Sequence, residues 1–124
     1  MEKTLYERLG GKPRIEKFVH EIVENHMRNP AIRARFLPYR DNAEKLAAIK
    51  HHVCAFLCAG TGGPETYSGR DMRTAHRGMN VSEHEYMAVL DDILDAAVKQ
   101  GYDEQIRKDL LAIAYSLKGD VMRL

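Results

Sequence analysis

His76 is the residue of this 124-residue chain best suited to bind a metal ion. It follows Met72 by four residues, so the two side chains share one face of a short helix predicted just before His76. An imidazole on such an element is the usual axial ligand of haem iron in oxygen-binding pockets. A single histidine on a short helix is more often structural, so the residue alone indicates a candidate ligand and no more.

The other five histidines divide by their places on predicted helices. His51 points away from the apolar face of a helix predicted at 41–60, and His52 lies at the edge of that face, within reach of an interior cavity. His20, His26 and His84 are expected to face solvent. On position alone, His52 is a second candidate ligand with a surface histidine as the alternative.

Cys54 and Cys58 are the two cysteines of the chain, and they are four residues apart. A regular helix would put them on one face with chain directions that do not suit a disulfide. The closer spacing of zinc and thioredoxin-like sites is absent, as is the C-x-x-C-H run of covalently attached c-type haem. We expect two reduced, partly buried thiols.

Charge and hydropathy exclude several classes of partner. The 19 basic and 18 acidic residues leave a net charge of +1 without a long basic run, which argues against nucleic acid. No stretch approaches the roughly 18 apolar residues of a membrane span, and no apolar block follows the N-terminal charges as in a signal peptide. We therefore expect a cytoplasmic protein without a membrane partner, with one domain over residues 1–124.

The elements that must position these side chains are helical, because apolar residues recur at helical spacing and no β-alternation competes. Thr4 with Glu7, and Ser82 with Glu85, have the spacing of capping boxes at helix starts. Helices are predicted at 5–9, 12–29, 31–37, 41–60 and 83–100, and from about 103 onward. The piece at 31–37 should end before Pro38, and the glycine-rich stretch 62–68 should be irregular.

Four segments together resemble the truncated haemoglobins, and among them the first group, which has cyanobacterial and mycobacterial members. They are LYERLGG at 5–11, the run from Pro30 to Phe36, GGPETYSGRDMRTAH at 62–76 and GMNVSEHEYMAVLDDI at 78–93. The resemblance implies an all-α truncated globin, a two-on-two helical sandwich with an extended loop before the proximal histidine. It implies one cofactor, haem b (iron protoporphyrin IX).

The same resemblance assigns site residues. His76 becomes the proximal iron ligand, and His52 aligns with a histidine that cyanobacterial relatives use as the sixth ligand. The other implied haem contacts are apolar or aromatic: Phe36, Ile49, Val53, Leu57, Met72, Val81, Tyr86 and Val89. These are also ordinary core positions, and in a haem protein the two interpretations coincide. Candidate partners for the haem propionates are Lys50, His51, Tyr67 and Arg70.

Two departures from the family pattern bear on function. Relatives that hold oxygen tightly have a tyrosine on the second helix and a glutamine on the third, where this chain has Val23 and Val53. Valine cannot donate a hydrogen bond, so we expect weak oxygen retention and inefficient nitric oxide dioxygenation. No histidine follows His84, which excludes the haem–histidine crosslink that some relatives form on the last helix.

The resemblance thus implies a protein that reversibly binds O2, NO or CO at iron opposite His76, with His52 as a candidate endogenous ligand. The alternative is a redox or nitric oxide-detoxifying haem protein served by an electron-donor reductase. A haem-free helical interaction module is the third hypothesis. A monomer or weak dimer is expected.

Overall fold

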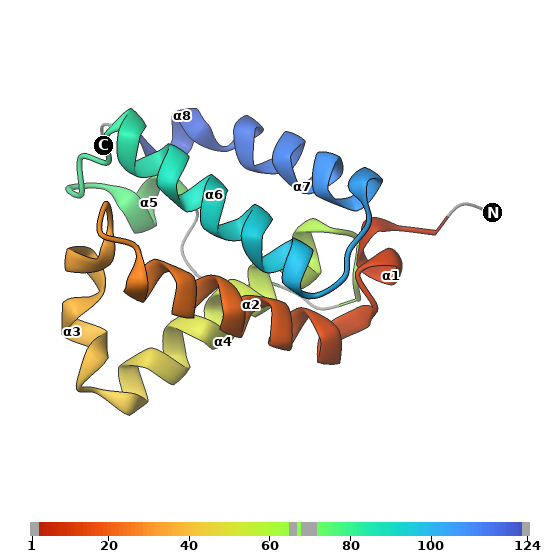
Figure 1. Ribbon diagram of the computed structural model, residues 1–124, viewed down its shortest axis with the longest axis horizontal. Coiled ribbons are helices and arrows are strands. Elements are labelled where there is room, and N and C mark those ends of the chain that lie inside the picture. Colours follow the sequence, from red (N-terminus) through yellow and green to blue (C-terminus); the bar gives the residue numbers. More distant parts are fainter. Residues whose placement is uncertain (1–2, 65–66, 68–71, 123–124) are drawn as a thin grey trace.

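The computed structural model describes residues 3–64, 67 and 72–122, and these form helices with no strand (Figure 1). The prediction of an all-α chain is therefore confirmed for the described residues. In chain order the helices are α1 (Leu5–Arg8), α2 (Gly11–Arg28), the 3-10 helix η1 (Arg33–Phe36), α3 (Leu37–Arg40), α4 (Ala43–Gly60), α5 (Met72–His76), α6 (Glu83–Lys99), α7 (Glu104–Ser116) and α8 (Lys118–Val121).

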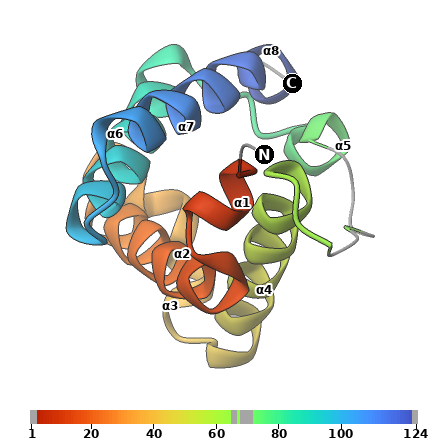
Figure 2. The ribbon, with the colours of Figure 1, turned by 90° about the vertical axis from the view of Figure 1, so that its right-hand side faces the viewer.

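Four long helices form two pairs. Helix α2 packs against α4, α6 packs against α7, and the pairs meet where α2 contacts α6. Figure 1 shows α6 and α7 above α2 and α4, and Figure 2 shows the same pairs from the end that carries α1. This is the two-on-two sandwich expected from the sequence. The short helices α3 and α5 lie at the opposite end from α1 (Figure 1).

Side-chain caps define the helix starts. Thr4 Oγ1 accepts a hydrogen bond from Glu7 N at 3.1 Å, and Ser82 Oγ accepts one from Glu85 N at 3.1 Å; in both boxes the glutamate also accepts from the cap residue's own N–H. Asp103 caps α7 through the N–H of the third helical residue, at 2.9 Å. Each such cap contributes about 1 kcal/mol. The two capping boxes follow the sequence prediction, whereas the cap at Asp103 was not predicted.

The chain breaks after α4, as the glycines predict. Gly62 has a φ of 96°, a left-handed conformation that side chains rarely adopt. A Cβ there would also come within 3.2 Å of the Thr4 side chain. The described residues between α4 and α5, 61–64 and 67, are not helical. The turn at Gly62 thus passes close to the N-terminal segment and starts the path that leads to α5.

Two apolar clusters form the core. The larger joins α1, α2, α4, α6 and α7, and at its centre the rings of Phe18 and Tyr102 meet edge to face with centroids 5.3 Å apart. The Tyr102 hydroxyl donates to the main-chain oxygen of Leu9 at 2.6 Å. The smaller cluster contains Val81, Tyr86, Leu90 and Val121, beside α5 and α8. None of the described helices has the length and apolar character needed to cross a lipid bilayer.

One predicted boundary is wrong. The segment 31–37 does not end before Pro38: the 3-10 helix η1 runs directly into α3, which contains Pro38 in its first turn. Proline is tolerated there because the first N–H groups of a helix have no partner within the helix. The short helix α8 was not predicted.

Candidate functional site

The His76 side chain lies on α5, and a hydrogen bond to the main chain determines which ring nitrogen carries the proton. Its Nδ1 is 2.8 Å from the main-chain oxygen of Met72, one turn earlier. A carbonyl oxygen only accepts hydrogen bonds, so Nδ1 carries the proton and the neutral ring keeps its lone pair on Nε2. The ring makes no other hydrogen bond with the residues that the structure describes. Metal-binding histidines are held in this way, through a hydrogen bond from the second ring nitrogen.

Helix α5 has only five residues and takes its position from α8. The two helices pack together, Arg73 pairs with Asp120 at 3.7 Å, and Met72 contacts the smaller apolar cluster. After His76 the chain turns through Gly78, which has a φ of 88°, to reach α6. His76 thus lies on a short helix that is held in place by α8 and the smaller apolar cluster.

Six of the eight predicted apolar contacts remain only partly buried by protein. They come from η1, α4, α5 and α6: Phe36, Ile49, Val53, Leu57, Met72 and Val89. Val53 and Leu57 lie at the margin of the larger cluster, whereas Met72 lies at the margin of the smaller one. Among the described residues, α4 and α5 do not pack closely against each other. A large flat apolar group such as haem fits this arrangement, because it would cover apolar surface that the protein leaves exposed.

Val81 and Tyr86 differ from the other six because both are buried in the smaller cluster. The Tyr86 hydroxyl donates to the main-chain oxygen of Ala114 on α7. Burial, with the nearby charge of Asp120, raises the pKa of Tyr86, so the hydroxyl stays protonated and keeps this bond. Both side chains belong to the cluster against which Met72 of α5 packs, and the Tyr86 hydrogen bond joins α6 to α7.

His52 is exposed in the structure. Its ring lies beside that of His51, which is also exposed, with centroids 5.8 Å apart. The neighbouring Val53 is partly buried. Coordination of iron by His52 would therefore require its ring to turn from solvent toward the inner face of α4.

The described candidate partners for the haem propionates make contacts with other residues or lie on the surface. Lys50 Nζ is 3.0 Å from Nδ1 of His20 and 3.4 Å from the Glu24 carboxylate, both on α2. The Tyr67 ring packs edge-on against Phe56, with centroids 5.3 Å apart. Arg70 lies outside the described residues.

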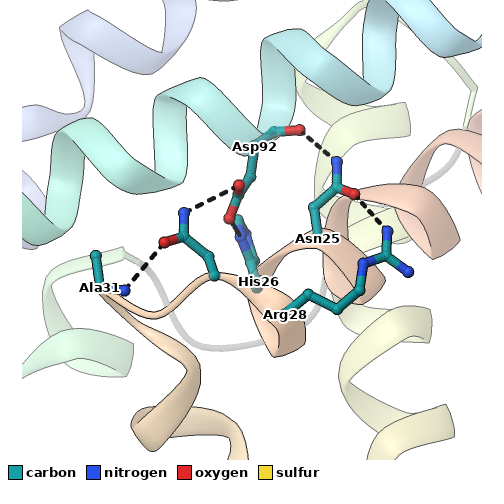
Figure 3. A network of polar contacts seen from close by, with 6 residues as sticks. Asn25, His26, Arg28, Ala31 and Asp92 are labelled. Carbon is teal, nitrogen blue, oxygen red and sulfur yellow. Dashed lines mark hydrogen bonds and ion pairs between the residues drawn. The ribbon is translucent and has the colours of Figure 1, made fainter.

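The expectation that His26 faces solvent is wrong. The residue is 8% exposed, and its Nδ1 is 2.7 Å from Oδ2 of Asp92 on α6 (Figure 3). His26 follows Ile22 by four residues and Val23 by three, so helical spacing puts it on the buried face of α2. The prediction followed the polar residue type, although the position on the helix indicates burial.

Asp92 was not singled out from the sequence. It lies between Ala88 and Ala96 at steps of four residues, and all three are buried. Small residues on both sides of a carboxylate allow a neighbouring helix to approach closely. This row of small residues is the sequence feature that could have indicated the burial of Asp92. The partner was not predictable, since His26 and Asp92 are 66 positions apart.

Arg35 also escaped the sequence interpretation. Its guanidinium group donates to both carboxylate oxygens of Glu85 and, at 2.9 Å, to the main-chain oxygen of Met79. The hydrogen bond from Arg35 is the main reason why the pKa of Glu85 is lowered from 4.5 to about 2. Arg35 thereby ties η1, and with it the adjacent Phe36, to the start of α6 and to the chain that follows α5.

A cavity of about 340 Å³ lies among α2, η1 and α3. Its lining residues are Met27, Arg33, Ala34, Phe36, Leu37 and Arg40. It shares Phe36 with the candidate haem contacts but contains no residue of α4 or α5, so it is distinct from the surface around His76.

Comparison with known proteins accounts for this arrangement. Residues 4–123 match the family described as bacterial-like globin. The Group 1 truncated hemoglobin GlbN of Synechocystis sp. is 33% identical over 117 residues, which cover 90% of this chain and 89% of the relative. GlbN of a Nostoc species is 28% identical over 119 residues, 96% of this chain and 97% of the relative.

A solved structure confirms the fold. The truncated hemoglobin of Tetrahymena pyriformis in its Fe(III) form superposes with a TM-score of 0.87 and 20% identity, over 98% of this chain and 100% of the other.

Proposed function

Since the chain belongs to the bacterial-like globin family, as a truncated haemoglobin, we propose that it binds haem b with Nε2 of His76 as the proximal iron ligand. The observation that carries this proposal is the 2.8 Å contact from His76 Nδ1 to the Met72 oxygen, which leaves Nε2 as the ring's lone-pair nitrogen. The partly buried apolar side chains around it would hold the porphyrin. Bound haem would supply an iron atom at which O2, NO or CO binds reversibly.

The chain's own residues would make the gas-binding side apolar. Val23 is buried in the larger cluster and Val53 lies at its margin, and neither side chain donates a hydrogen bond. Oxygen gains stability from a nearby donor, whereas CO gains much less, so we infer readily reversible oxygen binding. The lack of a hydrogen-bond donor at these two positions also argues against efficient nitric oxide dioxygenation, because that reaction needs bound oxygen to be retained. The alternative function is a redox or nitric oxide-detoxifying activity that depends on a reductase.

We infer that His52 is the endogenous sixth ligand in the absence of gas. The described structure gives the exposed His52 ring no partner except the neighbouring His51 ring, so turning it inward sacrifices little. A gas must then displace His52, and its apparent affinity falls by the fraction of molecules whose site is open.

We further propose that the haem is held without a covalent bond to the protein. The 2/2 hemoglobin of Synechococcus sp. has covalently attached heme, but this chain has no histidine after His84 and no C-x-x-C-H run. A cytoplasmic monomer or weak dimer completes the proposal.

Haemin titration of His76→Gly tests the proximal assignment. The wild-type protein should take up one haem per chain with an intense Soret band, whereas the variant should bind weakly and regain the band when imidazole is added. His84→Gly, which changes an exposed histidine, is the matched control and should behave as wild type. Tight stoichiometric haem binding by His76→Gly, with a wild-type spectrum, would overturn the assignment.

A further inference from the structure

We propose that His26, held in place by Asp92, is a positioning residue that orients the ring of Phe36 at the edge of the proposed haem site. The inference rests on the proposed function, because Phe36 is one of the partly buried apolar residues proposed to hold the porphyrin. The inference concerns a buried polar network between α2 and α6. Haem binding alone does not explain why this network is present.

The network leaves the Asp92 carboxylate little freedom (Figure 3). Oδ2 meets Nδ1 of His26 at 2.7 Å, and Oδ1 accepts from Nδ2 of Asn29 at 3.1 Å. The main-chain oxygen of Asp92 accepts from Nδ2 of Asn25 at 3.0 Å. The side chains of His26 and Asp92 are 10% and 9% exposed. The plane of the His26 ring is therefore set from α6, by a partner that is itself held at both oxygens.

The His26 ring in turn contacts Phe36. The ring centroids are 5.3 Å apart and the planes are inclined by 33°. Phe36 also contacts Tyr39, with ring centroids 6.1 Å apart. Aromatic rings at such separations restrict one another's orientation. Phe36 is the last residue of η1, so the contact with His26 adds to what the local backbone contributes to the orientation of its ring.

Asn29 extends the same control to the backbone. Its Nδ2 donates to Asp92, and its Oδ1 accepts from the N–H of Ala31 at 3.0 Å. This one side chain thus links α6 to the turn that leads into η1. Asp92 therefore acts on Phe36 by two routes, through the ring of His26 and through the turn before Arg33.

Stability alone is a weak reason for such a network. Taking a carboxylate and its partners out of water is costly, and well-packed apolar residues of similar volume are often as stable or more stable. What an apolar replacement would not reproduce is a fixed direction for the ring plane. We therefore interpret the network as a device for orientation.

Two substitutions separate the role of the His26 ring from that of the Asp92 carboxylate. His26→Gln keeps a group that can hydrogen-bond to Asp92 but removes the ring that contacts Phe36. Asp92→Asn keeps the shape of the carboxylate but weakens its hold on His26. Asp109→Asn is the matched control, because Asp109 of α7 also pairs across helices, with Arg8 of α1, and α1 lies at the opposite end of the molecule from α3 (Figure 1). Far-UV circular dichroism and haem stoichiometry would show that each variant folds and binds haem.

The first measurement does not need haem. The chain has three phenylalanines, so 4-fluorophenylalanine labelling yields three 19F resonances, and the resonance lost in Phe36→Leu is that of Phe36. His26→Gln and Asp92→Asn should shift or broaden the Phe36 resonance and leave the other two unchanged. An unchanged Phe36 resonance in both folded variants would overturn the proposal. If wild-type protein bound no haem, the proposed function would fail while this result still decided whether His26 orients Phe36.

The second measurement uses haem-loaded, reduced protein. His26→Gln should change the CO association rate at least threefold and split the C–O stretching band into more than one component. Combined with Phe36→Leu it should add nothing further, because residues that act through one another are not additive. Asp109→Asn should match wild type. Wild-type CO kinetics in His26→Gln, or independent effects of the two substitutions, would show that the pair only stabilises the fold.

Discussion

Glu85 binds Arg35 through both carboxylate oxygens, and one of these oxygens also accepts from the N–H of Ser82 at the start of α6. One side chain therefore closes a helix end and holds a segment 50 residues away in sequence. Because Phe36 follows Arg35 directly, this contact helps to set where the edge of the candidate haem site lies.

The contact predicts a defined acid sensitivity. The pKa of Glu85 in the folded protein is about 2, below its ordinary value of 4.5. Its contribution to stability is therefore complete above about pH 5 and is lost as the pH falls from 4.5 toward 2. Glu85→Gln should lower the free energy of unfolding by about 1 kcal/mol at pH 7, a modest effect because the pair is partly open to solvent.

Urea unfolding of wild type and Glu85→Gln at pH 7, 5, 4 and 3 measures this effect. The difference between the two proteins should be constant down to pH 5 and shrink below it. Glu104→Gln, at an exposed carboxylate paired only with Lys108 one turn along, should stay close to wild type at pH 7. A difference that remained unchanged to pH 3 would contradict the role assigned to the Arg35 contact.

Val53→Gln should place a hydrogen-bond donor on the face of α4 that is proposed to face the bound gas. One such bond contributes about 1 kcal/mol, so oxygen should dissociate roughly five- to tenfold more slowly, while CO dissociation changes little. Stopped-flow displacement of O2 by CO gives the rate, with Val53→Leu as the apolar control. Equal oxygen dissociation rates in the two variants would mean that position 53 does not face the gas.

His52→Leu tests the endogenous ligand. The ultraviolet–visible spectrum of reduced wild-type protein without gas should be that of low-spin, six-coordinate iron. The variant should be five-coordinate and bind CO faster, because no side chain has to leave first. His51→Leu, at the adjacent exposed histidine, should resemble wild type. A five-coordinate wild-type spectrum would exclude His52 as the ligand.

Tyr102→Phe should destabilise the haem-free protein by about 1–3 kcal/mol. The substitution keeps the ring that packs on Phe18 but removes the hydroxyl that donates to the buried Leu9 oxygen. Tyr115→Phe is the control, because Tyr115 is 62% exposed and should have an effect within about 0.5 kcal/mol. Denaturant unfolding followed by circular dichroism provides both values, and equal stabilities would show that the Tyr102 hydroxyl contributes nothing.

Local sequence patterns determined most of the helical architecture. The capping boxes at Thr4 and Ser82, the cap at Asp103 and the break at Gly62 all depend on residues within a few positions of one another. The shared helix face of Met72 and His76 is of the same kind, since side chains four residues apart on a helix lie on one face whatever the rest of the chain does. These features were predictable because their energetics are local.

Only the tertiary structure decided which polar side chains lie inside and what they bind. His26 is buried against Asp92, and Arg35 binds Glu85. Each contact joins two helices that lie far apart in the sequence. A buried charge is tolerated only where a partner on another element removes the cost of leaving water, and sequence spacing does not reveal that partner. The types and order of the helices were therefore written in the chain, while the polar contacts that hold Phe36 beside the candidate site arose when α2, η1 and α6 came together.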